Sequence, residues 1–232
     1  SMPTRNVCKK TSFMSSSTSS SDLASTSSST DTPEYAEIIG GGRIGSLLAE
    51  AGNCRLLGRS DSIDADKAGT PIFIATRNDA LQGIIQTCPE NRRQDLVFLQ
   101  NGYLDDFLAS HKLQDNTQVL LYVSVTAKGA PPIDGVTTVN PEGLTTATGR
   151  HAQAFANRLA ALNLKCNVVS ADAYKPSMYE KLIWISTYML VGTAKDCQSV
   201  GEAGTKYKEL VEQVITELVA AVSQKEKIQF VD

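Results

Sequence analysis

The chain has 232 residues, enough for one full domain and a smaller one, with 22 Lys and Arg against 25 Asp and Glu. This balance gives no bulk field that would favour nucleic acid or a membrane surface, and no apolar run approaches the roughly 20 residues of a membrane-spanning helix. The five cysteines are scattered and contain no CxxC pair, which argues against a disulfide framework. With only His111 and His151, a histidine-based metal site is not expected.

Residues 1–35 form a segment that we do not expect to fold. About half of them are Ser or Thr, and Arg5, Lys9 and Lys10 precede the first acid, Asp22. This composition resembles an organelle transit peptide, of a plastid more than of a mitochondrion. A low-complexity tail with no targeting role is the alternative. The first interpretation predicts a plastid or another organelle, and the second the cytoplasm.

Strands and helices alternate from Ala36 to about Gly129. Short buried runs predict the strands, and apolar residues at helical spacing predict the helices between them. The predicted strands are 36–39, 54–58, 71–75, 96–99 and 119–125. The predicted helices are 44–51, 79–88 and 103–110. The alternation predicts an α/β fold with a doubly wound, mainly parallel sheet of the Rossmann type.

The pattern changes after Gly129. Two Thr-rich stretches, 135–139 and 144–148, flank Asn140-Pro141-Glu142-Gly143 and predict a β-hairpin. The remaining predicted elements of this domain are a helix, 151–162, and a strand, 167–170. The sequence therefore predicts that this Rossmann-type domain extends over 36–172.

Everything from about Ala173 onward is expected to be helical, which makes 173–232 a short all-helical C-terminal domain. The predicted helices are 176–193 and 206–225. The second helix carries one apolar stripe, Leu210, Val214, Leu218 and Val222. The stripe packs within the subunit or forms a seam between subunits. We expect a homodimer through these helices, because one helix pair leaves an apolar stripe with little of its own chain to cover it.

A glycine-rich turn follows the first predicted strand. Gly40-Gly41-Gly42-Arg43-Ile44-Gly45 fits the pattern GxGxxG, which is a weak signal alone and gains meaning between a strand and a helix. In such a motif Gly40 permits the tight turn, Gly42 lets a pyrophosphate approach the backbone, and Gly45 lets helix and strand pack closely. The run is therefore predicted to bind a dinucleotide. A glycine-rich turn without a ligand is the alternative.

The ends of the second and third strands indicate which dinucleotide binds. NAD-binding members of this fold usually end the second strand with an acid that holds the ribose diol. Arg59 and Ser60 occupy that place, and Arg77 ends the third strand. Two guanidiniums and a hydroxyl suit the 2′-phosphate of NADP(H), so NADPH should bind more tightly than NADH by about 2–4 kcal/mol, roughly 30- to 1000-fold. Two solvated arginines at strand ends are the alternative.

Four motifs in order resemble those of ketopantoate reductases. They are Ile38-Ile39-Gly40-Gly41-Gly42-Arg43-Ile44-Gly45, Ala75-Thr76-Arg77-Asn78-Asp79-Ala80-Leu81, Leu99-Gln100-Asn101-Gly102 and Glu180-Lys181-Leu182-Ile183-Trp184. The resemblance covers 36 to about 205. It implies a Rossmann domain followed by a helical domain of the 6-phosphogluconate dehydrogenase type. It also implies NADPH-dependent reduction of a 2-oxo acid.

The resemblance assigns roles to single residues. It matches Arg59 and Arg77 with the family's basic residues for the 2′-phosphate, and Asn101 with an asparagine at the nicotinamide end of the cofactor. Lys181 matches the catalytic lysine, the general acid that protonates the carbonyl oxygen as hydride reaches the carbon. An ammonium near a developing alkoxide stabilises its charge and then protonates it. The alternative for Lys181 is a surface helix lysine paired with a carboxylate.

Two departures from the family concern the substrate. The family carries one asparagine a turn after its catalytic lysine and another a turn later, where this chain has Ile185 and Met189. The family's helical domain also continues beyond the position of Asp232 and supplies further substrate contacts. A buried carboxylate needs partners, so we expect this protein to be a poor ketopantoate reductase.

Three functions fit these residues. The first is an NADP(H)-dependent oxidoreductase that reduces a small carbonyl compound by hydride transfer, with Lys181 as its acid. The second is a non-catalytic NADP(H)-binding sensor or regulatory protein. The third is an interaction module with an empty Rossmann pocket, which Arg59 and Arg77 argue against. We expect the reductase, with a small-molecule substrate and with no metal, nucleic-acid or membrane partner.

Overall fold

The computed structural model describes residues 32–230, which form two compact units. The larger unit, Thr32–Ile185, contains the sheet and the helices that cover it. The smaller unit begins at Ser186 and is helical in its described part. The expected targeting segment, 1–35, lies almost entirely outside the described residues.

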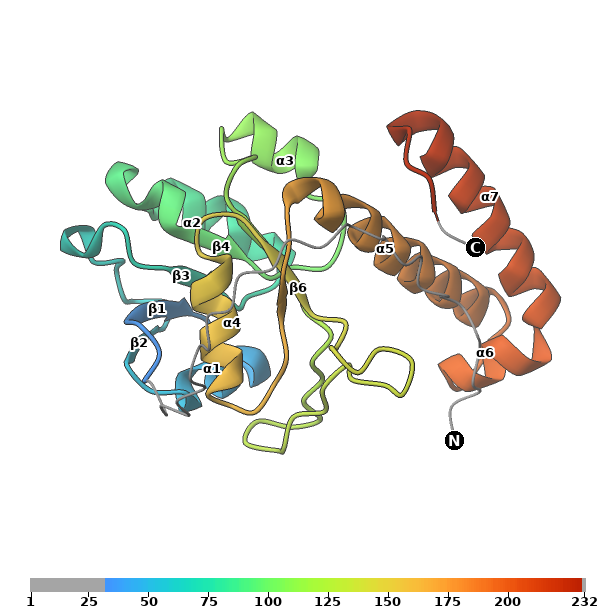
Figure 1. Ribbon diagram of the computed structural model, residues 1–232, viewed down its shortest axis with the longest axis horizontal. Helices are drawn as coiled ribbons and strands as arrows, with labels where there is room; N and C mark the ends of the chain where they lie inside the picture. The colour runs from blue at the N-terminus through green and yellow to red at the C-terminus, as the bar shows by residue number, and fades with distance from the viewer. Residues whose placement is uncertain (1–31, 231–232) are drawn as a thin grey trace, which may run out of the picture. The chain divides into compact units, whose positions relative to one another are not determined.

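One sheet forms the centre of the larger unit, with the strand order β2-β1-β3-β4-β5-β6-β7 (Figure 1). Its strands are β1 Ala36–Ile39, β2 Cys54–Leu57, β3 Ile72–Ile74, β4 Leu96–Phe98, β5 Thr117–Leu120, β6 Thr146–Thr148 and β7 Asn167–Val168. All neighbours are parallel except β5 and β6. Because β1 lies between β2 and β3, the order reverses there, and ligands of such sheets bind at the carboxyl ends beside this point. The predicted Rossmann-type fold is confirmed.

Helices cover both faces of the sheet, as a doubly wound fold requires. The helices of the larger unit are α1 Arg43–Glu50, α2 Leu81–Thr87, α3 Asp105–Ser110, α4 Ala152–Ala160 and the first part of α5 Ala171–Ala194. Phe73 packs in one core with residues of α1 and α4, whereas Ile72 and Ile74 pack in the other with residues of α2 and α3. Successive strand residues point to opposite faces, so the three apolar residues of β3 supply both cores.

The predicted hairpin over 135–148 is wrong. Only β6 forms from it, and β6 pairs with β5 and β7 instead of with 135–139. All three β6 residues are buried, so this threonine-rich strand lies inside the sheet and not on an exposed ribbon. The predicted strand over 119–125 also ends early, at Leu120, and an isolated antiparallel bridge joins Ser124 to Ile133 beyond it.

One helix begins earlier than predicted and another was not predicted, and each begins beside a serine that accepts a backbone hydrogen bond. Helix α5 begins at Ala171, five residues before the predicted start at Pro176, and the Ser170 hydroxyl accepts a hydrogen bond from the Ala173 amide at 3.3 Å. Helix α6, Val200–Lys206, was not predicted. Ser199 accepts from the Glu202 amide at 3.1 Å, which is the Ser-x-x-Glu pattern of a helix start.

The smaller unit packs the end of α5 against α6 and α7, Lys208–Glu226. Its buried centre comprises Val191, Ala203 and Val211, and Leu210 and Val214 of the predicted stripe pack against it. Leu218 and Val222, farther along the stripe, are half-buried and lie outside this cluster. The first half of the stripe therefore packs within its own unit.

A buried charge network closes the amino-terminal edge of the sheet. Arg92 is fully buried and contacts Glu37 at 3.0 Å and Asp95 at 2.8 Å. The other oxygen of Asp95 lies 3.1 Å from Nε2 of His151. Arg92 also donates to the carbonyl of Thr70 at 2.9 Å. These groups precede or begin β1, β3 and β4, so they lie opposite the edge that carries the glycine turn.

No helix within 32–230 is long and apolar enough to span a membrane. In the same stretch, no cluster of three or more His, Cys, Asp or Glu side chains is arranged to hold a metal ion.

Candidate active site

The glycine turn joins β1 to α1 in a conformation that requires two of its glycines. Gly40 has a φ of +103°, and a Cβ there would lie 2.8 Å from the carbonyl oxygen of Ala75. A Cβ on Gly45 would lie 1.7 Å from the carbonyl oxygen of Gly40. Gly42 is different, because a Cβ there would meet nothing within 4 Å. The turn is thus packed tightly against β3 on one side and open to solvent at Gly42.

The amino terminus of α1 is available to an anion. Its N-cap, Gly42, supplies no side-chain cap, and the first turn contains no acid. Free amides at a helix start attract phosphate groups. The side chain of Arg43 donates to the carbonyl oxygen of Val125 at 3.1 Å, and Ile44 packs against a hydrophobic core. The side chains of Arg43 and Ile44 are therefore engaged within the protein, and these two residues offer a ligand their backbone amides.

A groove with a volume of about 960 Å³ lies beside this turn. It is lined by Gly40 and Gly41, by Arg59 after β2, and by Arg77 after β3. The structure thus brings the two predicted arginines onto one groove, although their strands are not neighbours, because β2 and β3 flank β1 and end at the same edge of the sheet. Ser60 is exposed but does not line the groove.

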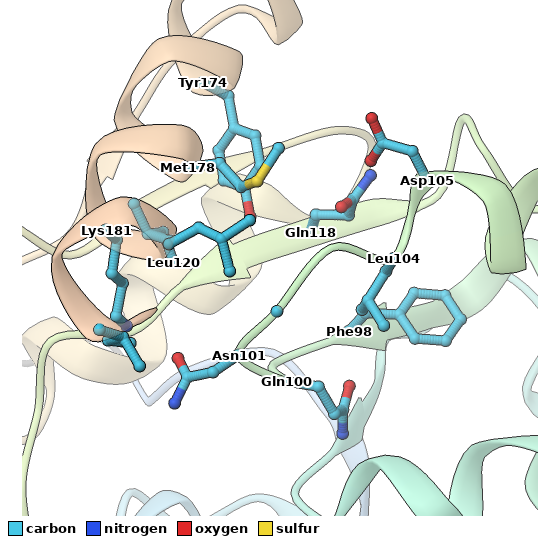
Figure 2. A pocket seen from close by; sticks show the side chains of 13 residues that line it. Phe98, Gln100, Asn101, Leu104, Asp105, Gln118, Leu120, Tyr174, Met178 and Lys181 are labelled. Atoms are coloured by element: carbon cyan, nitrogen blue, oxygen red, sulfur yellow. The ribbon is translucent and has the colours of Figure 1, made fainter. Parts of the chain in front are cut away.

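A second cavity, of about 20 Å³, lies where β4, β5 and α5 meet. Its volume is close to that of one water probe. Figure 2 shows Lys181 reaching from α5 toward the loop after β4 that carries Asn101. The remaining lining residues are Phe98, Gln100, Gly102, Leu104, Asp105, Gln118, Leu120, Tyr174, Met178, Leu182 and Ile185.

Lys181 is buried, with 7% of its surface exposed. Its Nζ donates to the carbonyl oxygen of Leu121 at 2.6 Å and lies 4.3 Å from the ring centroid of Tyr122. Within residues 32–230, Nζ forms no ion pair and has no second hydrogen-bond acceptor. Burial lowers the pKa of Lys181 to about 8. The alternative of a surface lysine paired with a carboxylate therefore does not describe this residue.

The loops after β3 and β4 are tied together beside the cavity. The Gln100 side chain donates to the carbonyl oxygens of Ile74 at 2.8 Å and Thr76 at 3.1 Å. The Asn78 side chain donates to the carbonyl oxygen of Asn101 at 3.1 Å. These bonds hold the backbone of Asn101 and leave its side-chain amide at the cavity (Figure 2). The cavity and the groove therefore lie at the same, carboxyl edge of the sheet.

The two departures from the family pattern are placed differently. Ile185 lines the cavity, whereas Met189 is 65% exposed and does not line it.

Sequence reasoning also missed Tyr122, whose ring holds the ammonium of Lys181. Burial, with a smaller contribution from Glu180, raises the pKa of Tyr122 to about 12, so its hydroxyl stays protonated at neutral pH. A position two residues past the end of β5 is the one signal that pointed to Tyr122.

These features define a Rossmann-type protein, and solved structures give the particular fold. The chain is similar to 2-dehydropantoate 2-reductase from Methylococcus capsulatus, with a TM-score of 0.60, 13% identity and coverage of 83% of this chain and 74% of that one. It is similar to a PanE/ApbA family ketopantoate reductase from Ralstonia eutropha JMP134, with a TM-score of 0.57, 16% identity and coverage of 85% and 76%. A complex of D-mandelate dehydrogenase with NADH matches with a TM-score of 0.53, 16% identity and coverage of 84% and 75%.

No family model and no curated protein matches the sequence. The structural similarity nevertheless extends over most of the chain. The protein therefore has the fold of the ketopantoate reductases, and the resemblance of its four motifs is confirmed at the level of fold.

Proposed function

We propose that this protein is an NADP(H)-dependent oxidoreductase that reduces a small carbonyl compound by hydride transfer. One observation carries the proposal: Lys181 is a buried ammonium without a counter-ion among the described residues, and it lines a cavity beside a glycine-rich groove. Burying an unpaired charge is costly. A group that is kept in this state at a cavity is a candidate for chemistry.

The groove suits the cofactor that the proposal requires. The amides at the start of α1 would hold its pyrophosphate, and Arg59 and Arg77 would contact its 2′-phosphate. The open space at Gly42 is where the pyrophosphate would approach the backbone. When bound, the cofactor supplies the hydride. Structures with this fold include one named as a complex of D-mandelate dehydrogenase with NADH, which supports a nicotinamide cofactor.

Lys181 would act as the general acid. The carbonyl of Leu121 and the ring of Tyr122 hold its ammonium group, and the cavity is the side from which a substrate oxygen can approach. A pKa of about 8 keeps most of the lysine protonated at neutral pH and makes it a stronger proton donor than an ordinary lysine. The proton moves from Nζ to the carbonyl oxygen as that oxygen gains negative charge.

The cavity favours an uncharged substrate over a 2-oxo acid. Among the described residues Lys181 is the one cation that lines it, and Asp105 contributes a carboxylate to the lining. Ile185 offers no hydrogen bond to a substrate carboxylate. Losing one hydrogen bond to a buried charged group costs about 1–3 kcal/mol, so the loss at Ile185 would lower the efficiency with ketopantoate by about one to two orders of magnitude.

A second candidate function is a non-catalytic NADP(H)-binding sensor. The small volume of the Lys181 cavity, about 20 Å³, favours it, because a carbonyl compound needs more room than one water molecule. On this account Lys181 and the groove would serve to bind the dinucleotide and report its presence.

One assay separates these functions. NADPH absorbance is followed with ketopantoate and with a panel of less polar ketones and aldehydes, while NADPH binding is measured by titration. The reductase predicts turnover of a panel member and poor turnover of ketopantoate. Efficient turnover of ketopantoate would contradict the role given to Ile185. Binding of NADPH without turnover of any compound would favour the non-catalytic sensor over the reductase.

The protein is further proposed to be a homodimer through the helices of 173–232. The exposed side chains of Met189 and Leu190, with 65% and 59% of their surface exposed, support an apolar face on the smaller unit. One structure with this fold is named as a dimeric ketopantoate reductase, from Staphylococcus aureus.

A further inference from the structure

The turn after β2 carries a carboxylate into the groove beside the two arginines. Asp61 lines the groove, and its Oδ2 accepts a hydrogen bond from the Gly58 amide at 2.7 Å. The amide of Asp61 in turn lies 3.4 Å from the Gly58 carbonyl oxygen. These contacts fix the carboxylate at the carboxyl end of β2. Its other oxygen, Oδ1, has no hydrogen-bond donor within the described part of the chain.

The four charged side chains of the groove form one closed pair and one open pair. Arg77 and Asp79 form an exposed ion pair at 2.9 Å, so each already has a partner of opposite charge. Arg59 makes no ion pair or side-chain hydrogen bond with residues 32–230, and Asp61 contacts only Gly58 there. The open charges are therefore one cation and one anion, two positions apart on the same turn.

We propose that Asp61 is a specificity determinant. It binds a ribose hydroxyl at the adenosine end of the cofactor and allows NADH to bind in addition to NADPH. The inference rests on the proposed function, since it requires a dinucleotide in the groove. A carboxylate accepts hydrogen bonds from the ribose diol and repels a 2′-phosphate. Arg59 has the opposite effect. The two side chains thus have opposite effects on the preference of the groove for NADPH over NADH.

The carboxylate is well placed for this role. An acid about 20 residues after the glycine turn is the usual partner of the ribose 2′-hydroxyl in this fold, and Asp61 stands near that spacing from Gly42. The Gly58 amide holds Oδ2, so the bond to the ribose needs little further ordering of the side chain. Arg59 attracts a 2′-phosphate beside it, which predicts a modest preference for NADPH rather than exclusion of NADH.

The test is the ratio of the dissociation constants of NADH and NADPH, measured by calorimetric titration of the full chain. Asp61→Asn retains an oxygen that can accept from the Gly58 amide but removes the negative charge. We expect NADH to bind more weakly, NADPH to bind more tightly, and the ratio to rise by about tenfold or more. Arg59→Ala should move the same ratio in the opposite direction.

Asp66→Asn is the matched control, because Asp66 is an exposed acid in the same connection and does not line the groove. A ratio in Asp61→Asn equal to that in Asp66→Asn would overturn the inference and leave the proposed function intact. Failure of the unmodified protein to bind either dinucleotide would overturn both. If Asp61→Asn unfolds at a lower temperature than the control, Asp61→Glu serves instead, and it should retain NADH binding.

Discussion

The two edges of the parallel sheet handle charge in opposite ways. At the amino-terminal edge, Arg92, Glu37 and Asp95 are buried and each is held by partners of opposite charge. At the carboxyl edge, Lys181 is buried without a counter-ion, and Arg59 has no ion-pair partner within 32–230. Closed networks stabilise a fold, whereas open charges are available to a ligand. Charged residues that stabilise the sheet thus lie at its amino-terminal edge, and charged residues that are available to a ligand lie at its carboxyl edge.

The largest expected effect comes from breaking the closed network. Arg92→Met leaves the carboxylates of Glu37 and Asp95 buried without their main partner, so we expect the free energy of unfolding to fall by about 3–5 kcal/mol. Urea denaturation measures this loss. Arg150→Met is the matched control, because Arg150 is an exposed partner of Asp95 at 3.7 Å, and its loss should cost less than about 1 kcal/mol. Equal effects of the two variants would contradict the account of this edge.

At the open edge, Arg59→Ala should weaken NADPH binding and leave stability unchanged. A charge-assisted hydrogen bond contributes about 1.5–3 kcal/mol, so the affinity for NADPH should fall about 10- to 100-fold. NADH lacks the 2′-phosphate, and its affinity should change little. Titration of both cofactors checks this. An affinity for NADPH that Arg59→Ala leaves unchanged would refute the contact of Arg59 with the 2′-phosphate.

Lys181 is expected to lower the stability of the folded state below about pH 8. Its pKa is about 8 in the folded protein and ordinarily 10.5, so between these values the unfolded chain binds the extra proton. The free energy of unfolding should therefore rise with pH over this window. Lys181→Met removes the effect and should be more stable at pH 7 by about 1–3 kcal/mol.

Urea denaturation between pH 7 and pH 10 follows this difference, which should shrink as the pH rises. Lys128→Met, at an exposed position, is the control and should show no such trend. Parallel stability curves for the unmodified protein and Lys181→Met would show that Lys181 is not desolvated in the folded state.

The smallest effect on stability is expected from Leu218→Glu, which tests the proposed dimer. Leu218 lies outside the packed centre of the smaller unit, whereas Val214 packs against it. The change should cost less than about 1 kcal/mol in folding and convert a dimer to a monomer in light scattering at tens of micromolar. Gln224→Glu, an exposed site on the same helix, is the control for added charge. A monomeric unmodified protein would argue against the dimer.

The open edge was largely predictable from the sequence, and the closed edge was not. Gly40, Arg59 and Arg77 were found because strand ends and a local glycine spacing fix their places. Glu37 lies within a predicted strand, and its partner Arg92 is 55 positions away, so no local pattern relates the two.

Two further differences have similar causes. Residues 144–148 are Thr-rich and follow a turn sequence like one arm of a hairpin, but the partners of β6 are the distant strands β5 and β7. The ammonium of Lys181 donates to the carbonyl oxygen of Leu121, 60 positions away, so no local pattern distinguishes this lysine from a surface lysine. Asp61 stands near the usual distance of an acid from the glycine turn, but Arg59 occupies the strand end where such an acid is expected.

The central claim is that Lys181 is the acid of a carbonyl reduction, and the pH dependence of kcat tests it most directly. With saturating NADPH and the best substrate of the carbonyl panel, kcat of the unmodified protein should be constant below about pH 8 and fall above it, because the protonated lysine is the active form. Lys181→Met should lower kcat by about 10²- to 10⁴-fold and leave the dissociation constant of NADPH unchanged. A variant that retains kcat within a few-fold of the unmodified protein, with the same pH profile, would contradict the claim.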